Sequence, residues 1–154
     1  MTLLNETARA PLEELCVALD LETTGRDPRR DAIIEVGAVK FRGEEEVATF
    51  HSLVNPFRDL SPFITQFTGI TQREVSGARS FGAVAPELAA FLGGLTIVGH
   101  SIAFDLAFLA QAGLELASER YDTLDLASVF LPSVRGYSLS ALVRAFGLTS
   151  QDRA

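Results

Sequence analysis

Apolar runs broken by turn residues dominate the first third of the chain and predict three β-strands. The runs cover residues 15–21, 32–41 and 47–54. A charged turn around Pro28 separates the first two runs, and a Gly-Glu-Glu-Glu segment connects the second run to the third. Because strands joined by such short connections pair antiparallel, we expect the sheet to begin with three antiparallel strands.

The rest of the chain alternates helical patterns with short strands. We expect a loop at Thr68-Gly69-Ile70-Thr71, a short turn over residues 73–75, and strands at residues 95–98 and around Tyr121. Helical spacing of apolar residues, with serine or threonine at the start and glycine or proline at the end, predicts helices over residues 62–67, 81–92, 103–112, 123–130 and 139–146. The element order predicts an α/β fold in which a mixed sheet, antiparallel and then parallel, is flanked by helices.

Composition adds bounds to this picture. The 154 residues suit one domain, and 47% of them are hydrophobic, which is enough for a full core. Residues 1–14 show no firm period, so we interpret them as a lead-in to a domain over residues 15–154. The single cysteine, Cys16, excludes an intrachain disulfide. No membrane-spanning apolar run and no signal-peptide pattern occur, which predicts a cytoplasmic protein without membrane partners.

The net charge of −7 argues mildly against a broad nucleic-acid-binding face. It does not exclude an enzyme that acts on nucleic acid. A metal site needs acidic ligands, and the bound cations reverse the local sign of the charge.

Two acids, Asp20 and Glu22, stand at the end of the first apolar run, just before a Thr-Thr-Gly turn. Residues two apart on a strand share a face and lie roughly 6.5 Å apart along it. From that distance two carboxylates can share a divalent cation, whereas without one they would repel each other. The alternative is a strand end leaving the core, where both acids are merely solvated.

A third acid, Asp105, comes after the Gly99-His100-Ser101 turn at the end of the predicted strand over residues 95–98. An aspartate in the first turn of a helix is also favoured by the helix dipole, which is the simpler explanation. The carboxyl ends of adjacent parallel strands, however, meet at one edge of the sheet, where ligands bind. We therefore expect Asp105 to lie beside Asp20 and Glu22 in a metal site.

Several short motifs agree in order and spacing with one known family. They are Asp20-Leu21-Glu22-Thr23-Thr24-Gly25, Ile33 to Val39, Leu53 to Pro56, Thr68 to Thr71, His100 to Asp105, Tyr121 to Leu124 and Tyr137-Ser138-Leu139. Over residues 17–148 the chain resembles the DEDD-type 3′–5′ exonucleases. It is most similar to the DnaQ-like group, which includes proofreading exonuclease domains of bacterial DNA polymerase III and exonuclease domains fused to helicases. The resemblance implies a ribonuclease H-like fold.

The resemblance also implies a reaction, namely hydrolysis of the terminal phosphodiester at a single-stranded or frayed 3′ end of DNA. Two Mg²⁺ or Mn²⁺ ions would activate a water and stabilise the leaving oxygen. Asp20 would bridge both ions, Glu22 would hold one, and Asp105 would act at the second. The polymerase or helicase module would lie on the same or another chain. Substrate contacts are expected from Leu21, Thr23, Thr24, Gly25, Ile70, His100, Ser101 and Phe104. For Phe104, a plain helix-core role is the alternative.

The family pattern has a fourth acid, and its DEDDh branch has a histidine general base five residues before that acid. Neither is found at the family spacing in these 154 residues. Asp152 is interpreted as a solvated tail residue, His51 as a surface residue, and His100 as shaping its loop or touching substrate. We expect the domain to stop before its last catalytic helix and to be weakly active, because a lost general base costs about 10²–10⁴-fold.

Other functions remain open at this point. RNA-specific relatives share the same motifs, because discrimination of RNA rests on contacts to the 2′-hydroxyl group. A non-catalytic module that binds nucleic-acid ends and a phosphohydrolase of small molecules are the further alternatives.

Overall fold

A computed structural model describes residues 14–148. The lead-in expected over residues 1–14 therefore falls outside the described residues except for Glu14, and so does Asp152, which was expected in a solvated tail. None of the described helices is long and apolar enough to cross a membrane.

The described residues form six strands and six helices. The strands are β1 (Cys16–Thr23), β2 (Ile33–Arg42), β3 (Glu45–Asn55), β4 (Arg79–Ser80), β5 (Thr96–Gly99) and β6 (Arg120–Asp122). The helices are α1 (Pro62–Thr68), α2 (Gln72–Ser76), α3 (Phe81–Leu92), α4 (Ile102–Gln111), α5 (Thr123–Phe130) and α6 (Leu139–Ala145).

One sheet contains all six strands in the order β4-β3-β2-β1-β5-β6. The pairs β1–β2 and β2–β3 are antiparallel, while β1–β5, β5–β6 and β3–β4 are parallel. This arrangement confirms the predicted mixed sheet with antiparallel strands first and parallel strands after them. The first strand lies inside the sheet, where β2 pairs with it along its whole length and β5 pairs with residues 16–18.

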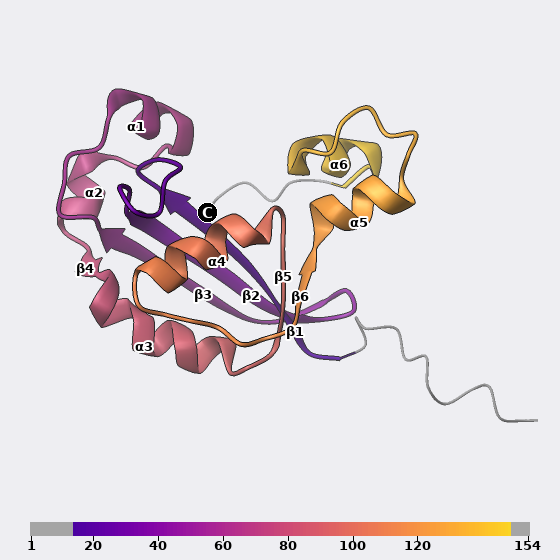
Figure 1. The fold of residues 1–154 in the computed structure, drawn as a ribbon, viewed down its shortest axis with the longest axis horizontal. Helices are drawn as coiled ribbons and strands as arrows, with labels where there is room; N and C mark the ends of the chain where they lie inside the picture. Colours follow the sequence, from indigo (N-terminus) through magenta and orange to yellow (C-terminus); the bar gives the residue numbers. More distant parts are fainter. Residues whose placement is uncertain (1–13, 149–154) are drawn as a thin grey trace, which may run out of the picture.

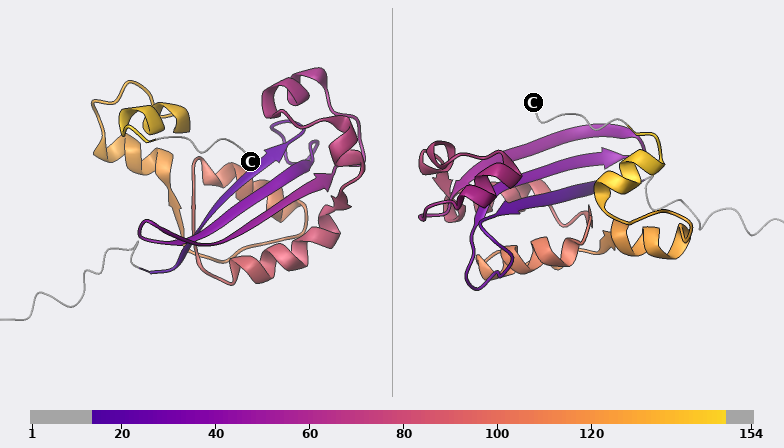
Figure 2. Two further views of the ribbon diagram at one scale, coloured as in Figure 1. Left: turned by 180° about the vertical axis from the view of Figure 1, so that it is seen from behind. Right: turned by 90° about the horizontal axis from the view of Figure 1, so that it is seen from above.

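Helices α3 and α4 cover one face of the sheet, and most of the opposite face is left without helices (Figure 1). Helices α1 and α2 lie at the end of the sheet where β1 finishes, whereas α5 and α6 lie on the other side, beyond β6 (Figure 2). The open face is therefore bordered by helical segments at two sides. Asp20 and Glu22 lie on this open face, opposite the buried Leu19 and Leu21.

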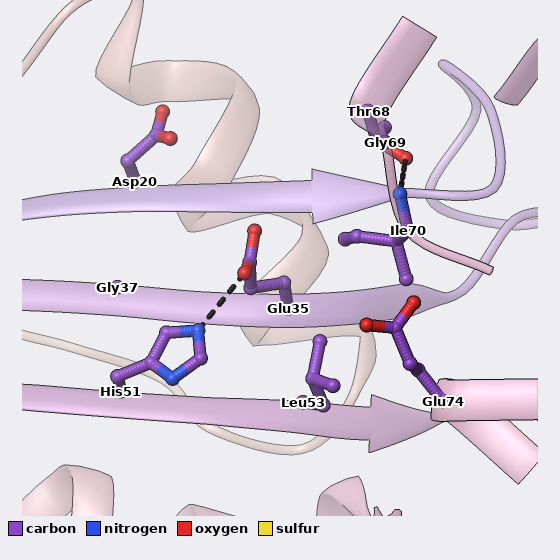
Figure 3. Close-up of a pocket in the computed structure, with 9 residues that line it drawn as sticks. All are labelled: Asp20, Glu35, Gly37, His51, Leu53, Thr68, Gly69, Ile70 and Glu74. Atoms are coloured by element: carbon purple, nitrogen blue, oxygen red, sulfur yellow. Dashed lines mark hydrogen bonds and ion pairs between the residues drawn. The ribbon is translucent and has the colours of Figure 1, made fainter. Parts of the chain in front are cut away.

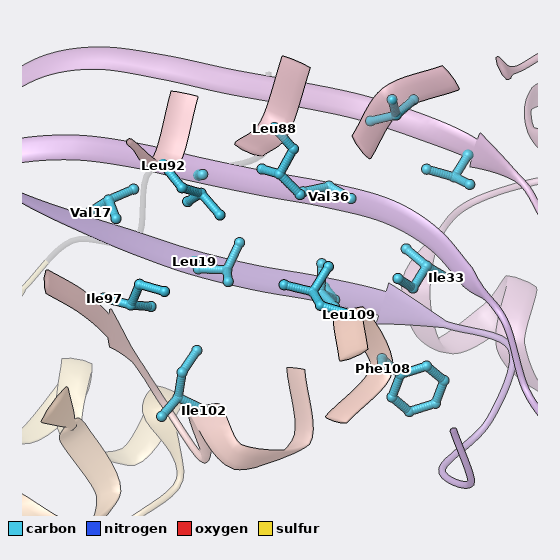
Figure 4. Packing of buried hydrophobic residues seen from close by; sticks show 14 residues of the cluster. Val17, Leu19, Ile33, Val36, Leu88, Leu92, Ile97, Ile102, Phe108 and Leu109 are labelled. Atoms are coloured by element: carbon cyan, nitrogen blue, oxygen red, sulfur yellow. The ribbon is translucent and has the colours of Figure 1, made fainter. Parts of the chain in front are cut away.

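The main core fills the space between the sheet and its two covering helices (Figure 4). Odd-numbered residues 17–21 of β1 point into it and are buried, together with Leu88, Leu92 and Leu109 from the helices. Even-numbered positions of β1 face the other way, because side chains alternate along a strand. This alternation directs Asp20 and Glu22 to the open face.

A second, smaller cluster joins α1 and α2 to the sheet. It contains Ile34, Ile64, Ile70 and Val75, all buried. Ile34 belongs to this cluster although Val36, two residues further along β2, belongs to the main core, because the pairing of β1 with β2 shifts between Glu22 and Thr23. Such an irregularity adds one residue to a strand and reverses the facing of the residues beyond it. Because of this shift, Ile34 of β2 packs against α1 and α2.

The predicted elements agree with the structure to within about two residues at most ends, which is the usual uncertainty of helix ends. One prediction was wrong, and one strand was missed. Residues 73–75 were expected in a turn but belong to helix α2, which has a complete capping box between Thr71 and Glu74. The two-residue strand β4 was not predicted, because only its pairing with Val54 and Asn55 defines it.

Candidate active site

Asp20 and Glu22 lie on the last half of β1, and both face the open side of the sheet. In the β1–β2 register, Asp20 is opposite Gly37 and Glu22 is opposite Glu35. Asp20 is exposed, while Glu22 is half-buried. The predicted pair of carboxylates on one face is therefore present.

Asp105 reaches the same place from the first turn of α4. Strand β5 pairs with β1 only at residues 16–18, so the remaining edge of β1 has no strand beside it to accept its amide hydrogens. The backbone N–H of Leu21 points to that edge and donates to Asp105 Oδ1 at 2.9 Å. Asp105 is thus anchored to the residue between Asp20 and Glu22, which brings the three acids expected from the sequence to one part of the molecule.

The electrostatics of Asp105 are those of a buried acid beside a second acid. Its side chain is only 4% exposed. Burial, followed by the negative charge of Asp20, raises its pKa to about 7, against the lowering effect of the Leu21 amide. A divalent cation between the carboxylates would remove this repulsion, and hard oxygen donors are the ligands that Mg²⁺ and Mn²⁺ prefer.

Within residues 14–148, no three His, Cys, Asp or Glu side chains are grouped closely enough to form a ready metal cluster. The charge of Asp20 acts on the anchored Asp105. Glu22 lies on the same face of β1 as Asp20. The donor set therefore fits a divalent metal.

The turn between β5 and α4 is held by Asp122, which sequence reasoning missed as a site residue. Its carboxylate accepts the amide hydrogens of Ser101, Ile102 and Leu124 at 2.9–3.0 Å. Burial alone would raise the pKa of Asp122, but these donors outweigh it and hold the pKa below the ordinary value. Asp122 therefore fixes the start of α4 and, through it, the position of Asp105.

Close packing at Gly99 fixes the same turn. A Cβ atom added there would clash with Ile102 Cδ1 and lie 3.0 Å from the Ile102 Cβ. Ile102 is buried at the first position of α4. The glycine therefore lets the helix approach the strand closely enough for Asp105 to reach Leu21.

We expect Asp122→Ala to impair metal binding more than a surface change would. Removing the carboxylate leaves two amides at the start of α4 and the N-terminal cap of α5 without their acceptor, at a cost of about 1–3 kcal/mol. By analogy with outer-shell partners of metal ligands, Mn²⁺ affinity should fall about 10–100-fold. Calorimetric titration with Mn²⁺ measures this directly.

The matched control is Asp125→Ala, which removes an exposed carboxylate from the first turn of α5, the helix that Asp122 caps. It should leave the Mn²⁺ affinity unchanged. A loss of stability in Asp122→Ala with unaltered Mn²⁺ affinity would contradict the positioning role.

In the loop after β1, the residues predicted to bind substrate mainly make hydrogen bonds within the loop. The Thr23 hydroxyl donates to the Gly25 carbonyl at 2.6 Å, and the Thr24 hydroxyl contacts Asp31 and accepts from the Ala32 amide. A Cβ atom on Gly25 would clash with the Asp31 carboxylate. All three residues line one pocket with Glu22, so contacts to substrate by this loop stay a prediction.

The other predicted substrate residues have varied surroundings. Leu21 is buried in the core and offers its amide to Asp105. Ile70 is buried in the small cluster but lines the pocket that contains Asp20. Phe104 is half-buried, packs against Phe108 with ring centroids 4.9 Å apart, and lines the pocket of the Thr-Thr-Gly loop.

His100 and Ser101 form the turn itself. His100 Nδ1 is 3.0 Å from Thr123 Oγ1, and the ring lines a pocket shared with Asp20. Ser101 is exposed and has a left-handed backbone with φ 59°. Both placements fit a loop-shaping role, which the sequence offered as one of two roles for His100.

A contact between an acid and a histidine lies on the open face beside Asp20 (Figure 3). His51 Nε2 and Glu35 Oε1 are 2.9 Å apart, and both residues line a pocket of about 540 Å³ with Asp20. The His51 side chain is 63% exposed, in agreement with the surface position predicted for it. Glu35 was not among the site residues expected from the sequence. The β1–β2 register places it opposite Glu22, and this register could not be read from the sequence.

The profile of the exonuclease family (RNase_T) matches residues 17–153. The chain belongs to the exonuclease family. The match covers the three acids and the loop after β1, and it confirms the family expected from the motifs. Members of this family generally depend on divalent metal ions. Assignment to the DEDDh branch stays a prediction.

Relatives of this exonuclease domain are much longer proteins. It is 42% identical over 137 residues to the PolC-type DNA polymerase III of Thermotoga maritima, covering 86% of this chain and 10% of that protein. It is 37% identical over 132 residues to the 3′-5′ exonuclease DinG of Bacillus subtilis, covering 82% of this chain and 14% of that protein. The chain thus spans about a tenth of the length of such relatives.

Solved exonuclease structures share the fold. Exonuclease X in complex with 5′ overhanging duplex DNA superposes with a TM-score of 0.73 at 27% identity, covering 88% of this chain and 75% of that one. A product-bound exonuclease I superposes with a TM-score of 0.75 at 18% identity, covering 91% of this chain and 40% of that one. These neighbours confirm the predicted ribonuclease H-like fold of the exonuclease domain.

Proposed function

We propose that this exonuclease domain removes nucleotides from the 3′ end of DNA in a reaction that depends on two Mg²⁺ or Mn²⁺ ions. The observation that carries the proposal is the hydrogen bond from Leu21 to Asp105, which joins the third acid to the strand of the other two. The names of the relatives, a DNA polymerase and a 3′-5′ exonuclease, support the polarity and the choice of DNA.

Asp20, Glu22 and Asp105 would hold the ions. When bound, two such ions activate a water and stabilise the leaving oxygen of a phosphodiester. Asp20 is exposed on the open face, where it is accessible to both substrate and metal, while buried Asp105 is fixed by Leu21. This combination gives one rigid ligand and two that adjust.

The loop after β1 and helix α1 would receive the 3′-terminal nucleotide. Thr23 to Arg26, Phe104 and residues of α1 enclose a pocket of about 610 Å³ that adjoins Glu22. The mixture of aromatic and polar groups suits a nucleoside, whose base stacks and whose sugar hydroxyl hydrogen-bonds. The pocket therefore orients the 3′ end toward the acids.

A decisive experiment compares single-stranded DNA labelled at the 5′ end with the same DNA labelled at the 3′ end, in Mn²⁺. We expect a ladder of shortened products from the 5′-labelled strand and free mononucleotide from the 3′-labelled strand. Glu22→Gln should reduce the rate by more than about 100-fold, because outer-shell changes alone cost about 10–100-fold.

Glu115→Gln is the matched control, since Glu115 is exposed between α4 and β6, and its rate should equal that of the parent. Mononucleotide release from the 5′ end, or cleavage that ignores Glu22→Gln, would overturn the proposal. A matched RNA strand in the same assay decides between DNA and RNA. Faster degradation of the RNA strand than of the DNA strand would instead make this domain an RNA 3′-exonuclease.

The setting of the domain is part of the proposal. The similarity to a PolC-type DNA polymerase III supports a role beside a polymerase module, on the same or another chain. A helicase module is the alternative that the family resemblance implies. A frayed 3′ end delivered by that module would be the natural substrate.

A further inference from the structure

Strand β3 is the outer strand of the antiparallel part of the sheet, and most of its outer edge carries no neighbouring strand. Strand β2 pairs with its inner edge from Glu45 to Leu53. On the outer edge, β4 pairs only with Val54 and Asn55. Within residues 14–148, no strand pairs with the outer edge of residues 45–53. This free edge can accept a further strand.

The register identifies the backbone groups that point outward from the free edge. The Leu21 amide points away from β2, because it donates to a side chain of α4. Its partner Val36 therefore points toward β3, where it is paired with Ser52. Backbone groups point to opposite sides at successive residues of a strand. Ser52 thus bonds to β2, and the N–H and C=O groups of Thr49 and His51 point outward.

The free edge has the composition of a strand and little protection against pairing. Residues 47–53 are Val-Ala-Thr-Phe-His-Ser-Leu and contain no Asp, Glu, Lys, Arg or Pro. β-Branched and aromatic residues favour strands, whereas charges and proline commonly keep edges unpaired. The glutamates at positions 44–46 and the pairing shift between Lys40 and Phe41 protect only the beginning of the edge. The rest of the edge is suited to pairing with another chain.

We propose that β3 pairs antiparallel with β3 of a second copy of this chain, around a two-fold axis at Phe50. Thr49 then lies opposite His51 of the second copy, and the two residues exchange both backbone hydrogen bonds. An axis at Phe50 uses the regular stretch between the pairing shift near Val47 and the first residue paired with β4, Val54. Such an interface is isologous, because one surface meets itself.

The side chain at the axis supports this register. Phe50 is half-buried and packs against Phe91 of α3, with ring centroids 5.6 Å apart. At the axis, Phe50 forms a non-hydrogen-bonded pair with its own copy, the arrangement in which opposite side chains are closest. Aromatic pairs across strands stabilise sheets. The exposed part of the Phe50 ring is therefore covered by the same ring of the second copy.

Charges at the two ends of the free edge are complementary. Antiparallel pairing brings the start of one β3 to the end of the other, so that Glu46 of the second copy arrives beside Arg79 at the start of β4. The Arg79 guanidinium donates from Nη1 and Nη2 to Glu87, and a guanidinium has further N–H groups to offer. An extended segment of another protein is the alternative occupant. The second copy is favoured because it matches the edge both at its middle and at its end.

The pairing makes one continuous sheet from both copies. A two-fold axis that relates antiparallel strands within one sheet is perpendicular to that sheet, so both open faces point to the same side. The candidate active sites of the two copies therefore accept substrate from one side. The metal-site acids lie on β1 and α4 rather than on β3, so the interface does not rest on the proposed function.

Sedimentation velocity of the metal-free chain over a range of concentrations tests the interface. We expect the parent to have twice the mass of one chain. Thr49→Pro removes the outward N–H and leaves the bonds between β3 and β2 in place, because proline is tolerated where its nitrogen faces away from the sheet. Its dissociation constant should rise about 10-fold or more, since one hydrogen bond is lost at each Thr49. Thr49→Val keeps the N–H and, as the matched control, should associate as the parent does.

Oxidative cross-linking tests the register. An axis at Phe50 places Ala48 opposite Ser52 of the second copy, at a non-hydrogen-bonded pair with Cα atoms about 4.5 Å apart, within the range of a disulfide. A mixture of Ala48→Cys and Ser52→Cys should therefore form a covalent dimer. Each variant alone should stay uncross-linked, because its two cysteines would lie far apart along the strands. The native Cys16 is 1% exposed and should not interfere.

A parent that sediments as a monomer at every concentration would overturn the interface and leave the edge to a strand of another protein. A Thr49→Pro variant that associates as tightly as Thr49→Val would overturn it as well. Cross-linking by either cysteine variant alone, or none in the mixture, would contradict the axis at Phe50. The circular dichroism of Thr49→Pro should match that of Thr49→Val; if it does not, the cross-linking decides alone.

Discussion

Replacement of Asp105 by Asn should abolish metal-dependent hydrolysis while leaving the fold intact. Asparagine has nearly the shape of aspartate, and its carbonyl oxygen can still accept the Leu21 amide at the edge of β1. The change removes the negative charge that would bind a divalent cation. We expect the rate of hydrolysis to fall by more than about 100-fold, beyond the range typical of outer-shell residues.

The measurement pairs a steady-state rate in Mn²⁺ with chemical denaturation of the metal-free protein. At neutral pH the variant should be more stable than the parent, because a buried charge that faces Asp20 has been neutralised. Asp125→Asn, at an exposed position on α5, should change neither quantity. A variant that keeps its activity, or one that fails to fold, would refute the assignment of Asp105 as a ligand held by Leu21.

The metal-free parent should lose stability as the pH rises from about 4 to about 7. The pKa of Asp105 lies near 3.8 in the unfolded chain and is raised to about 7 in the folded one, chiefly by burial and then by Asp20. Between these two values the folded state binds a proton that the unfolded state does not, so stability falls with increasing pH and levels off above 7. The shift corresponds to a loss on the order of 4 kcal/mol, a large part of the stability of a small domain.

Urea denaturation at several pH values in EDTA checks this prediction. The difference between the parent and Asp105→Asn isolates the contribution of Asp105, because groups such as Asp122, whose pKa is lowered, act in both proteins with the opposite sign. Mg²⁺ in excess should remove most of the decline in the parent and little in the variant, since binding only to the folded state stabilises it. Identical pH profiles for the two proteins would show that Asp105 carries no raised pKa.

Local signals in the sequence were enough for most elements. Ser61, Ser80 and Ser138 each cap a helix as expected, because capping depends only on the residues within one turn. The same reasoning should have found α2, since Thr71 and Glu74 form a capping box. Strand β4 carries no such local signal.

The candidate site was predictable in outline and not in detail. Convergence of Asp20, Glu22 and Asp105 was expected from the rule that parallel strands end at one edge. The bond from Leu21 to Asp105 was not, because it depends on where β5 stops pairing with β1. The contact of Glu35 with His51 depends likewise on the register of β2 with β3, which spacing along the chain does not specify.

The early end of β5 has a consequence for how this protein tolerates change. If β5 continued alongside β1 for two more residues, its carbonyls would compete with Asp105 for the Leu21 amide. The sheet would gain a hydrogen bond and the enzyme would lose a ligand. Insertions between Gly99 and Ile102 that lengthen β5 should therefore reduce activity more than they reduce stability. A gap in the sheet, rather than an added structure, makes room for the third acid.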